Sequence, residues 1–483
     1  MTENNLVTKV WNYASVLAQS GVEYLDYVSQ LTYLLFLKMD EERTDLLNEE
    51  SLLPADCRWS NLLKLSGTEL SDKYQNILDK LSKQTGIIGT IYKKASNKIS
   101  NPANLSRLIS LINGETWMGL DIDVKGEIYE GLLEKTAKDA KSGAGVYFTP
   151  RPLIRAMVKV MRPTPETTVV DPACGTGGFL LIAYEYMKKQ TKDQEKIRAL
   201  KEKKLFGTDI TPLVVSLCAM NMYLHGIGGK NSPVTEGDSL MNASDKRYDM
   251  VLANPPFGKK GGLKIIGEDG SVTTEKEEYN RDDFIATTSN KQLNFVQHIM
   301  TILNSHGRAA VVVPDNVLFE GGAGEKIRRR LLNEFNLHTV LRLPTGIFYA
   351  QGVKANVIFF DKYPPLDKGH RTNDVWFYDL RTNMNLSLVT NSLNDSHLAD
   401  FIKCYNADNI MARTESERFK KFSYDEIIKR DKVSLDITWL KDESLESLEN
   451  LPEPEILADE IVDNLETALI SFKDVLTELQ KAE

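Results

Sequence analysis

The chain has 483 residues, 42% of them hydrophobic and 26% charged, a balance typical of globular proteins that bury a core. Its 59 lysines and arginines are outnumbered by 68 aspartates and glutamates, and the net charge of −9 by itself argues against a nucleic-acid-binding protein. The four cysteines are widely spaced, which indicates neither disulfides nor a cysteine metal site. No apolar run nears the ~20 residues of a membrane helix and the polar start is unlike a signal peptide, so we expect a cytoplasmic protein without a membrane partner.

Residues 1–140 are predicted to form a helical N-terminal domain. Apolar residues recur there at intervals of three and four, as in Leu25, Val28, Leu31 and Leu35, and β-branched alternation is scarce. From residue 168 onward, short β-branched runs alternate with helical stretches, which predicts a mostly parallel sheet with helices on both faces. We expect this α/β domain to cover residues 141–440. Its predicted strands lie at 169–171, 205–207, 249–252, 309–313 and 357–360.

Two further segments depart from this pattern. Residues 258–290 are glycine-rich, charged and without periodicity, which favours a long functional, mobile loop over an insertion with no role. Residues 441–483 are predicted to be a helical tail with an a/d seam, which can dock on a partner subunit or on the chain's own N-terminal domain. The seam consists of Ile461, Leu465, Ala468, Phe472, Val475 and Leu479.

A glycine-rich turn at 171–178 joins the first predicted strand to a helix. Gly175 and Gly177 let the backbone approach a ligand closely, and free N–H groups at the helix start face the same space. The dinucleotide pattern Gly-x-Gly-x-x-Gly fails at Leu180, and no phosphate-loop lysine follows. Two interpretations of the turn remain: it binds a nucleoside cofactor, or it is purely structural.

Aspartates follow the next two predicted strands. Asp209 ends the second strand, where a carboxylate can accept hydrogen bonds from both ribose hydroxyls of a nucleoside. Asp238 follows the next short β-type stretch. Each alone is more often an ordinary loop residue, but with Asp171 they mark three successive strand ends.

The segment Asn254-Pro255-Pro256-Phe257 is the most specific one in the chain. The two prolines stop the strand and leave carbonyls as acceptors only. The Asn254 side-chain carbonyl and the Pro255 main-chain carbonyl can together receive both hydrogens of an exocyclic amino group, while Phe257 offers a face for a flat base. The alternative is a simple strand-ending turn.

Residues 171–179 and 254–257 together resemble the paired signature of S-adenosylmethionine-dependent N6-adenine DNA methyltransferases, and 145–153 resemble the segment that closes over the cofactor in this group. Thr149 can cap a helix that begins at Pro150. The resemblance implies a Rossmann-like methyltransferase sheet and no metal. It places S-adenosylmethionine against Tyr147, Phe148, Thr149, Pro150, Asp171, Ala173, Gly175, Thr176, Gly177, Gly178, Asp209 and Asp238.

The resemblance extends from about residue 8 to about residue 362. Residues 25–38, 128–133, 313–319 and 343–349 are similar to the modification subunit of type I restriction-modification systems. This implies a complex in which a specificity subunit reads duplex DNA and two copies of this chain methylate one adenine on each strand. Whether an ATP-dependent restriction subunit joins is left open. The tail is then a docking helix for the specificity subunit.

We therefore hypothesise direct methyl transfer to a flipped-out adenine that stacks on Phe257 and presents N6 to Asn254 and Pro255. A methyltransferase for RNA or protein amides and a non-catalytic scaffold are the alternatives. A nicotinamide-dependent dehydrogenase is disfavoured by the broken glycine pattern. Lys259 and Lys260 follow the base-binding segment, whereas the tail is acidic. This distribution predicts weak DNA affinity for the isolated chain and dependence on a more basic partner.

Overall fold

The computed structural model describes residues 24–47, 50–117, 149–257, 262–266, 272–276, 278–348, 353–384, 386–387 and 391–441, with Tyr13, Ala458, Val462 and Leu465 as isolated positions. The chain divides into two compact units, which are described separately below. The N-terminal unit comprises Met1–Arg151 and Pro163–Ser239. The C-terminal unit comprises Pro152–Arg162 and Leu240–Glu483. The predicted seam of the tail lies outside the described residues except for Leu465.

Helices form the first part of the N-terminal unit, as predicted. They are α2 (Tyr24–Leu47), α3 (Gly67–Ser82), α4 (Gly86–Ile91) and α5 (Pro102–Asn113), with short 3-10 turns at Ala55–Cys57 and Trp59–Asn61. Asn101 caps α5 by accepting a hydrogen bond from the Ala103 N–H at 2.9 Å, and Pro102 occupies the first helical turn, where its missing N–H costs nothing. One apolar face of α3 is buried at helical spacing.

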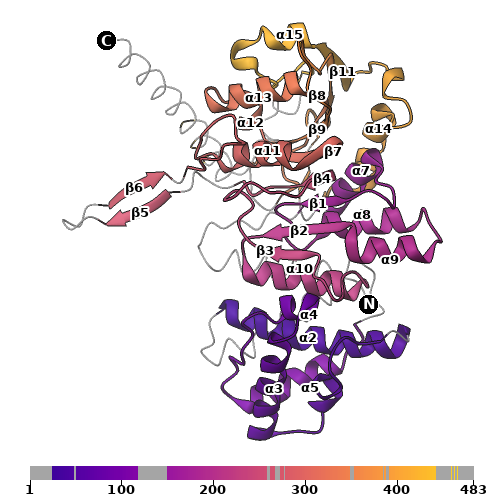
Figure 1. Cartoon of the computed structure of the whole chain (residues 1–483), viewed down its shortest axis with the longest axis vertical. Coiled ribbons are helices and arrows are strands. Elements are labelled where there is room, and N and C mark those ends of the chain that lie inside the picture. Colours follow the sequence, from indigo (N-terminus) through magenta and orange to yellow (C-terminus); the bar gives the residue numbers. More distant parts are fainter. Residues whose placement is uncertain are drawn as a thin grey trace. The chain divides into compact units, whose positions relative to one another are not determined.

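The second part of the N-terminal unit is a three-stranded parallel sheet in the order β1, β2, β3. The strands are β1 (Val169–Asp171), β2 (Leu205–Asp209) and β3 (Val234–Glu236), and the helices are α8 (Gly178–Lys188), α9 (Gln194–Lys203) and α10 (Pro212–Leu224). Helices α8 and α9 pack on β1 and β2, whereas α10 packs on β2, β3 and the helices α2 and α4 (Figure 1). The register aligns the carboxyl ends of the strands at one edge.

The C-terminal unit contains a mixed sheet in the order β11, β10, β8, β9, β7, β4. Its strands are β4 (Tyr248–Ala253), β7 (Leu303–Pro314), β8 (Phe335–Arg342), β9 (Ala355–Lys362), β10 (Asp374–Asp379) and β11 (Phe419–Ser423). Its helices are α7 (Arg151–Met161), α11 (Lys291–Ile302), α12 (Asn316–Phe319), α13 (Ala323–Glu334), α14 (Asp395–Tyr405) and α15 (Tyr424–Ile428), with 3-10 turns at Ile410–Ala412 and Asp431–Val433.

The strand directions differ in part from the mostly parallel sheet predicted from the sequence. Strands β4 and β7 are parallel, as are β8 and β10, but β9 runs antiparallel to both of its neighbours and β11 runs antiparallel to β10. The described residues of the connection between β8 and β9, 343–348 and 353–354, contain no helix, whereas parallel neighbours are usually joined by a crossover helix. The α/β fold class with a helical N-terminal part is confirmed.

The predicted loop at 258–290 is wrong for ten of its residues. Strand β5 (Gly262–Ile266) pairs in antiparallel register with β6 (Val272–Lys276) as a separate two-stranded sheet (Figure 1). Glycines and charges conceal this hairpin in the sequence, although Ile265, Ile266, Val272, Thr273 and Thr274 are β-branched. None of the helices described in the structure is long and apolar enough to cross a membrane.

Candidate active site

The glycine-rich turn after β1 has one glycine that packs inward and one that faces open space. Gly177 has φ +85°, and a Cβ there would lie 2.5 Å from Met222 Cε and 2.8 Å from Cys218 Sγ, both on α10. Gly175 has φ +51°, and a Cβ there would meet nothing within 4 Å. Both positions favour glycine for their backbone conformation, but only Gly175 presents its backbone to open space.

Two carboxylates hold this turn in place. Asp171 is 2% exposed and its Oδ1 accepts a hydrogen bond from the Ala173 N–H at 3.0 Å. Asp209 Oδ2 accepts from the Gly175 N–H at 3.2 Å, and its Oδ1 accepts from the Thr211 N–H at 2.9 Å. Thus the ends of β1 and β2 are joined through the turn, as the sequence predicts for strand ends at one edge.

Burial disfavours the ionised form of these two carboxyl groups. Burial, with a smaller contribution from the nearby Asp209, raises the pKa of Asp171 to about 8, although the hydrogen bond from Ala173 acts in the opposite direction. Burial also raises the pKa of Asp209. A cationic ligand at this edge would relieve the cost of two neighbouring carboxylates, whereas a phosphate would increase it.

Asp238 belongs to the same edge. It lies half-buried after β3, next to Ser239, whose Oγ donates a hydrogen bond to the Pro172 carbonyl at 2.7 Å. The loop after β3 is thereby attached to the glycine-rich turn. Thr149 and Pro150 are half-buried and precede α7, which begins at Arg151, one residue later than predicted. Tyr147 and Phe148 lie outside the described residues.

Two residues at this edge were not predicted from the sequence. Asn221 on α10 is fully buried, and its Nδ2 donates a hydrogen bond to the Thr176 carbonyl in the turn at 3.0 Å. Ile210 directly follows Asp209 and is 63% exposed, so a large apolar side chain stands at the edge. In the sequence, Asn221 stands out only as a single amide side chain within the apolar run of α10.

The second part of the candidate site lies in the C-terminal unit, where β4 ends. Asn254 is 7% exposed and Pro255 is buried, whereas Phe257 is half-buried. The ring of Phe257 packs edge to face with that of Phe348, with centroids 5.6 Å apart and an interplanar angle of 85°. Asn254 and Pro255 thus end β4, and the half-buried ring of Phe257 follows them.

The described cofactor residues of the prediction thus belong to the N-terminal unit, and the predicted base-site residues belong to the C-terminal unit. Among the described residues, no group of three or more His, Cys, Asp or Glu side chains is arranged to hold a metal ion.

Comparison with known proteins assigns the chain to a family. The model of the N-6 DNA methylase family matches residues 120–443, and that of the HsdM N-terminal domain matches residues 6–112. The type I restriction enzyme StySPI methylase subunit of Salmonella potsdam is 39% identical over 531 residues, covering 99% of this chain and 96% of the relative. This chain belongs to the type I methylase subunits.

Solved structures of type I methylase subunits share the fold of this subunit. A crystal structure described as the modification subunit of a type I restriction enzyme from Vibrio vulnificus YJ016 has a TM-score of 0.73 and 28% identity, covering 94% of this chain and 99% of that one. The EcoKI M protein of Escherichia coli has a TM-score of 0.53 and 35% identity, covering 98% and 96%.

Membership in this family confirms the main function predicted from the sequence, an N6-adenine DNA methyltransferase of a type I restriction-modification system. An amino-methyltransferase for RNA or protein and a non-catalytic scaffold are not supported. For the methylase subunit, the family implies S-adenosylmethionine as the methyl donor.

Proposed function

We propose that this methylase subunit methylates N6 of an adenine flipped out of duplex DNA, and that the two parts described above act as its cofactor and base sites. The observation that supports this most is the end of β4, where the nearly buried Asn254 and the buried Pro255 are followed by the accessible ring of Phe257. Such a site is suited to a flat base with an exocyclic amino group.

The proposed cofactor site is the edge at the ends of β1, β2 and β3. S-adenosylmethionine supplies an electrophilic methyl group on a sulfonium cation. Its positive charge fits the carboxylates of Asp171 and Asp209, and the open space above Gly175 leaves room for a ligand close to the backbone. Phosphate-bearing cofactors fit poorly because the turn is not followed by a phosphate-loop lysine.

Individual roles within the cofactor site follow from chemistry. Asp209 ends β2 and would accept hydrogen bonds from the ribose hydroxyls, Asp238 would accept from the adenine amino group, and Ile210 would lie against the adenine ring. The residues of the turn and of the preceding segment would surround the rest of the cofactor. They are Tyr147, Phe148, Thr149, Pro150, Asp171, Ala173, Gly175, Thr176, Gly177 and Gly178.

The base-site residues would stabilise the charge that develops during transfer. As N6 attacks the methyl group, the nitrogen gains positive charge, and the carbonyl oxygens of Asn254 and Pro255 present fixed dipoles to its hydrogens. Pro256 removes a second N–H and keeps the segment stiff. Phe257 would stack on the extruded base and offset part of the few kcal/mol that extrusion costs.

The subunit would act within a larger complex. We propose that a specificity subunit reads duplex DNA and that a second copy of this chain serves the other strand. We also propose the domain division 1–140, 141–440 and 441–483, with the last segment docking on the specificity subunit.

The test is methylation by the assembled complex of Asn254→Ala subunits with the specificity subunit. We expect N6-methyladenine formation to fall by about 100-fold or more, because a fixed dipole at the reacting nitrogen is lost. S-adenosylmethionine binding, measured by calorimetry, should stay within about twofold of the wild type, because Asn254 is not among the cofactor residues. Methylation at the wild-type rate would contradict the proposed role of Asn254.

A further inference from the structure

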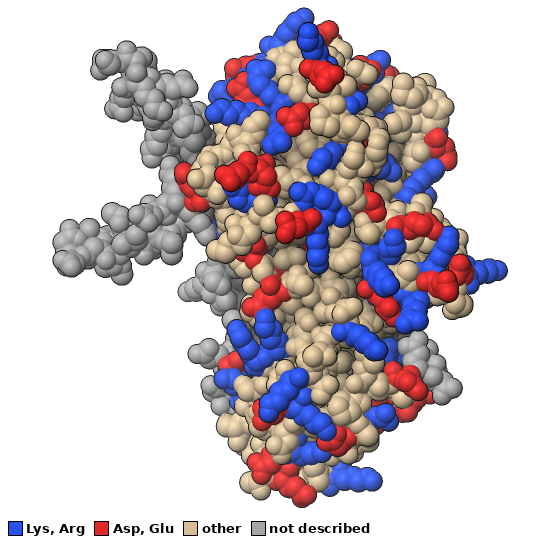
Figure 2. Space-filling model, viewed as in Figure 1, with Lys and Arg blue, Asp and Glu red and all other residues tan. Residues whose placement is uncertain are grey.

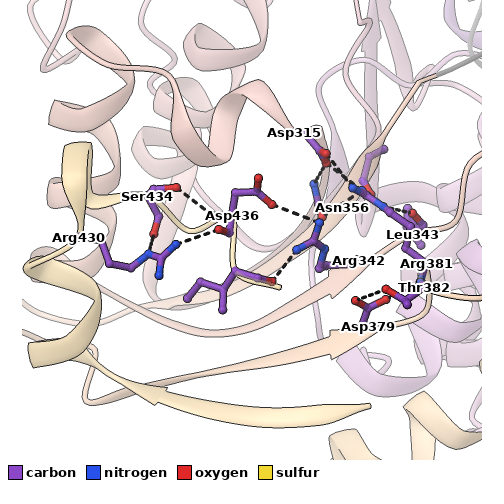
Figure 3. A network of polar contacts seen from close by, with 12 residues as sticks. Asp315, Arg342, Leu343, Asn356, Asp379, Arg381, Thr382, Arg430, Ser434 and Asp436 are labelled. Atoms are coloured by element: carbon purple, nitrogen blue, oxygen red, sulfur yellow. Dashed lines mark hydrogen bonds and ion pairs between the residues drawn. The ribbon is translucent and has the colours of Figure 1, made fainter. Parts of the chain in front are cut away.

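A network of polar side chains lies in the C-terminal unit, where β7 and β10 end and β9 begins (Figure 3). It connects Asp315 after β7, Asn356 on β9 and Arg381 after β10. The Arg381 guanidinium forms a two-pronged ion pair with the Asp315 carboxylate at 2.7 and 2.8 Å, and Asn356 Nδ2 donates to the same carboxylate at 2.7 Å. Asn356 is fully buried and the Arg381 side chain is 14% exposed.

The ion pair is fixed from several sides. Burial alone would raise the pKa of Asp315, but the hydrogen bonds and charge of Arg381 outweigh it, so the pKa of Asp315 is lowered and the pair stays ionised. The Arg381 main-chain N–H donates to Asp379 Oδ1 at 2.8 Å, and Asp379 is itself buried. A guanidinium held in this way has one defined orientation.

Arg381 also holds the loop that follows β8. Its Nε donates to the Leu343 carbonyl at 2.8 Å and its Nη2 donates to the Ala355 carbonyl at 2.9 Å, while the Leu343 N–H donates to the same Ala355 carbonyl at 3.0 Å. The start of the loop is thus attached to β9 both directly and through one side chain.

Phe348, five residues further along this loop, supports the proposed base-stacking ring. Phe348 is 2% exposed and packs edge to face with Phe257. Gly346 has φ +76° and fits tightly against the carbonyl of Leu386, where a Cβ would come within 2.2 Å of the oxygen. The loop therefore has little freedom between its attachment to Arg381 and its contact with Phe257.

We infer that Arg381 is a positioning residue for the target base: through the Leu343 carbonyl it holds the loop 343–348, and through Phe348 it holds the ring of Phe257 on which the extruded adenine stacks. This inference depends on the proposed function, since it assigns Arg381 to the capture step of that reaction. Arg381 touches neither the base nor the methyl donor in this role.

Arg381→Lys tests the inference in the complete complex. Lysine keeps a charge for Asp315 but cannot bond to Asp315, Leu343 and Ala355 at once. The readout is kcat/KM for methylation on two duplexes, one with a paired target adenine and one with a mispaired target that costs less to extrude. We expect a loss of about tenfold on the paired target, which shrinks to about threefold or less on the mispaired one.

Arg342→Lys is the matched control. Arg342 belongs to the same network and is 5% exposed, but its guanidinium bonds to the Ile437 carbonyl at 2.5 Å and pairs with Asp436 at 3.2 Å, whereas the Leu343 carbonyl is bound by Arg381 (Figure 3). Any loss in this variant should be equal on both duplexes. Phe348→Leu should reproduce the Arg381→Lys pattern. The double variant should lose no more activity than the more impaired of the two single variants.

An equal loss of activity on both duplexes for Arg381→Lys would overturn the inference and leave a purely structural role. Additive losses in the double variant would overturn it as well. The proposed function is judged separately by Asn254→Ala, which should lose about 100-fold or more of its activity on both duplexes. If Asn254→Ala methylates normally, the proposed function fails whatever Arg381→Lys shows.

Discussion

Burial decides which single side chains carry a charge in this protein. His298 on α11 is 5% exposed, and its Nδ1 lies 3.2 Å from Arg281 Nη1. Burial and, to a smaller extent, the charge of Arg281 lower the pKa of His298 to about 3. The imidazole is therefore neutral and accepts a hydrogen bond from Arg281, which forms an ion pair with Asp283 at 2.6 Å.

This predicts a pH dependence of stability. The unfolded chain binds a proton at His298 below about pH 6.5, whereas the folded chain does so only near pH 3, so stability is complete above pH 6.5 and is lost as the pH falls. The free energy of unfolding should fall by about 1.4 kcal/mol per pH unit for this one group. Urea unfolding between pH 8 and pH 5 should show a shallower pH dependence for His298→Gln than for the wild type. Identical slopes would contradict the prediction.

Among the elements, α10 stands out because it supports the glycine-rich turn on one face and the N-terminal helices on another. Asn221 and Cys218 face the turn. Ser216 and Tyr223 lie on another face, where Ser216 Oγ donates to the Ile91 carbonyl at 2.5 Å and the Tyr223 hydroxyl donates to Asp40 at 2.8 Å. A helix buried on both of these faces ties the turn to a rigid support.

This arrangement predicts that Asn221→Leu weakens cofactor binding. The substitution removes the hydrogen bond to the Thr176 carbonyl and leaves that buried oxygen without its partner, at a cost of about 1–3 kcal/mol. We expect calorimetry to show S-adenosylmethionine affinity reduced by about tenfold.

Ser216→Ala is the control for Asn221→Leu, because it loses one buried hydrogen bond of α10 on the face away from the turn. It should lower the melting temperature while leaving cofactor affinity unchanged. Equal affinity in Asn221→Leu and the wild type, or equal losses in both variants, would show that the hydrogen bond to Thr176 has no part in forming the cofactor site.

For the whole molecule, the important quantity is charge. The net charge is −9, and Figure 2 shows lysines and arginines interspersed with aspartates and glutamates over the visible face. Several of these charges are paired with each other, as in Lys93 with Glu236 and Arg155 with Asp395. Paired charges contribute little to the release of counterions from a DNA backbone.

The isolated subunit should therefore bind duplex DNA weakly. We expect a dissociation constant of about 10⁻⁵ M at physiological salt, in the range of non-specific binding, and much tighter binding once the specificity subunit is present. Fluorescence anisotropy with a labelled duplex, repeated at several salt concentrations, measures both. Tight binding by the isolated subunit would contradict the prediction.

The local features of this protein follow from its amino-acid sequence alone. Glycines at 175 and 177 take up left-handed conformations, two prolines stop β4 after Asn254, and aspartates end β1 and β2, because each of these effects arises from a residue's own backbone or its immediate neighbours. The helical N-terminal part and the alternation of strands and helices follow from apolar periodicity in the same way.

Which distant residues come into contact depends on the tertiary structure. Asn221 reaches the Thr176 carbonyl across 45 residues and Arg381 reaches Asp315 across 66, and Phe348 packs on Phe257 from another loop. The antiparallel direction of β9 and the β5–β6 hairpin are likewise not evident from the sequence. Strand order and register determine these contacts. A buried polar group or ring contacts the residues that the packed fold places beside it, at any separation along the chain.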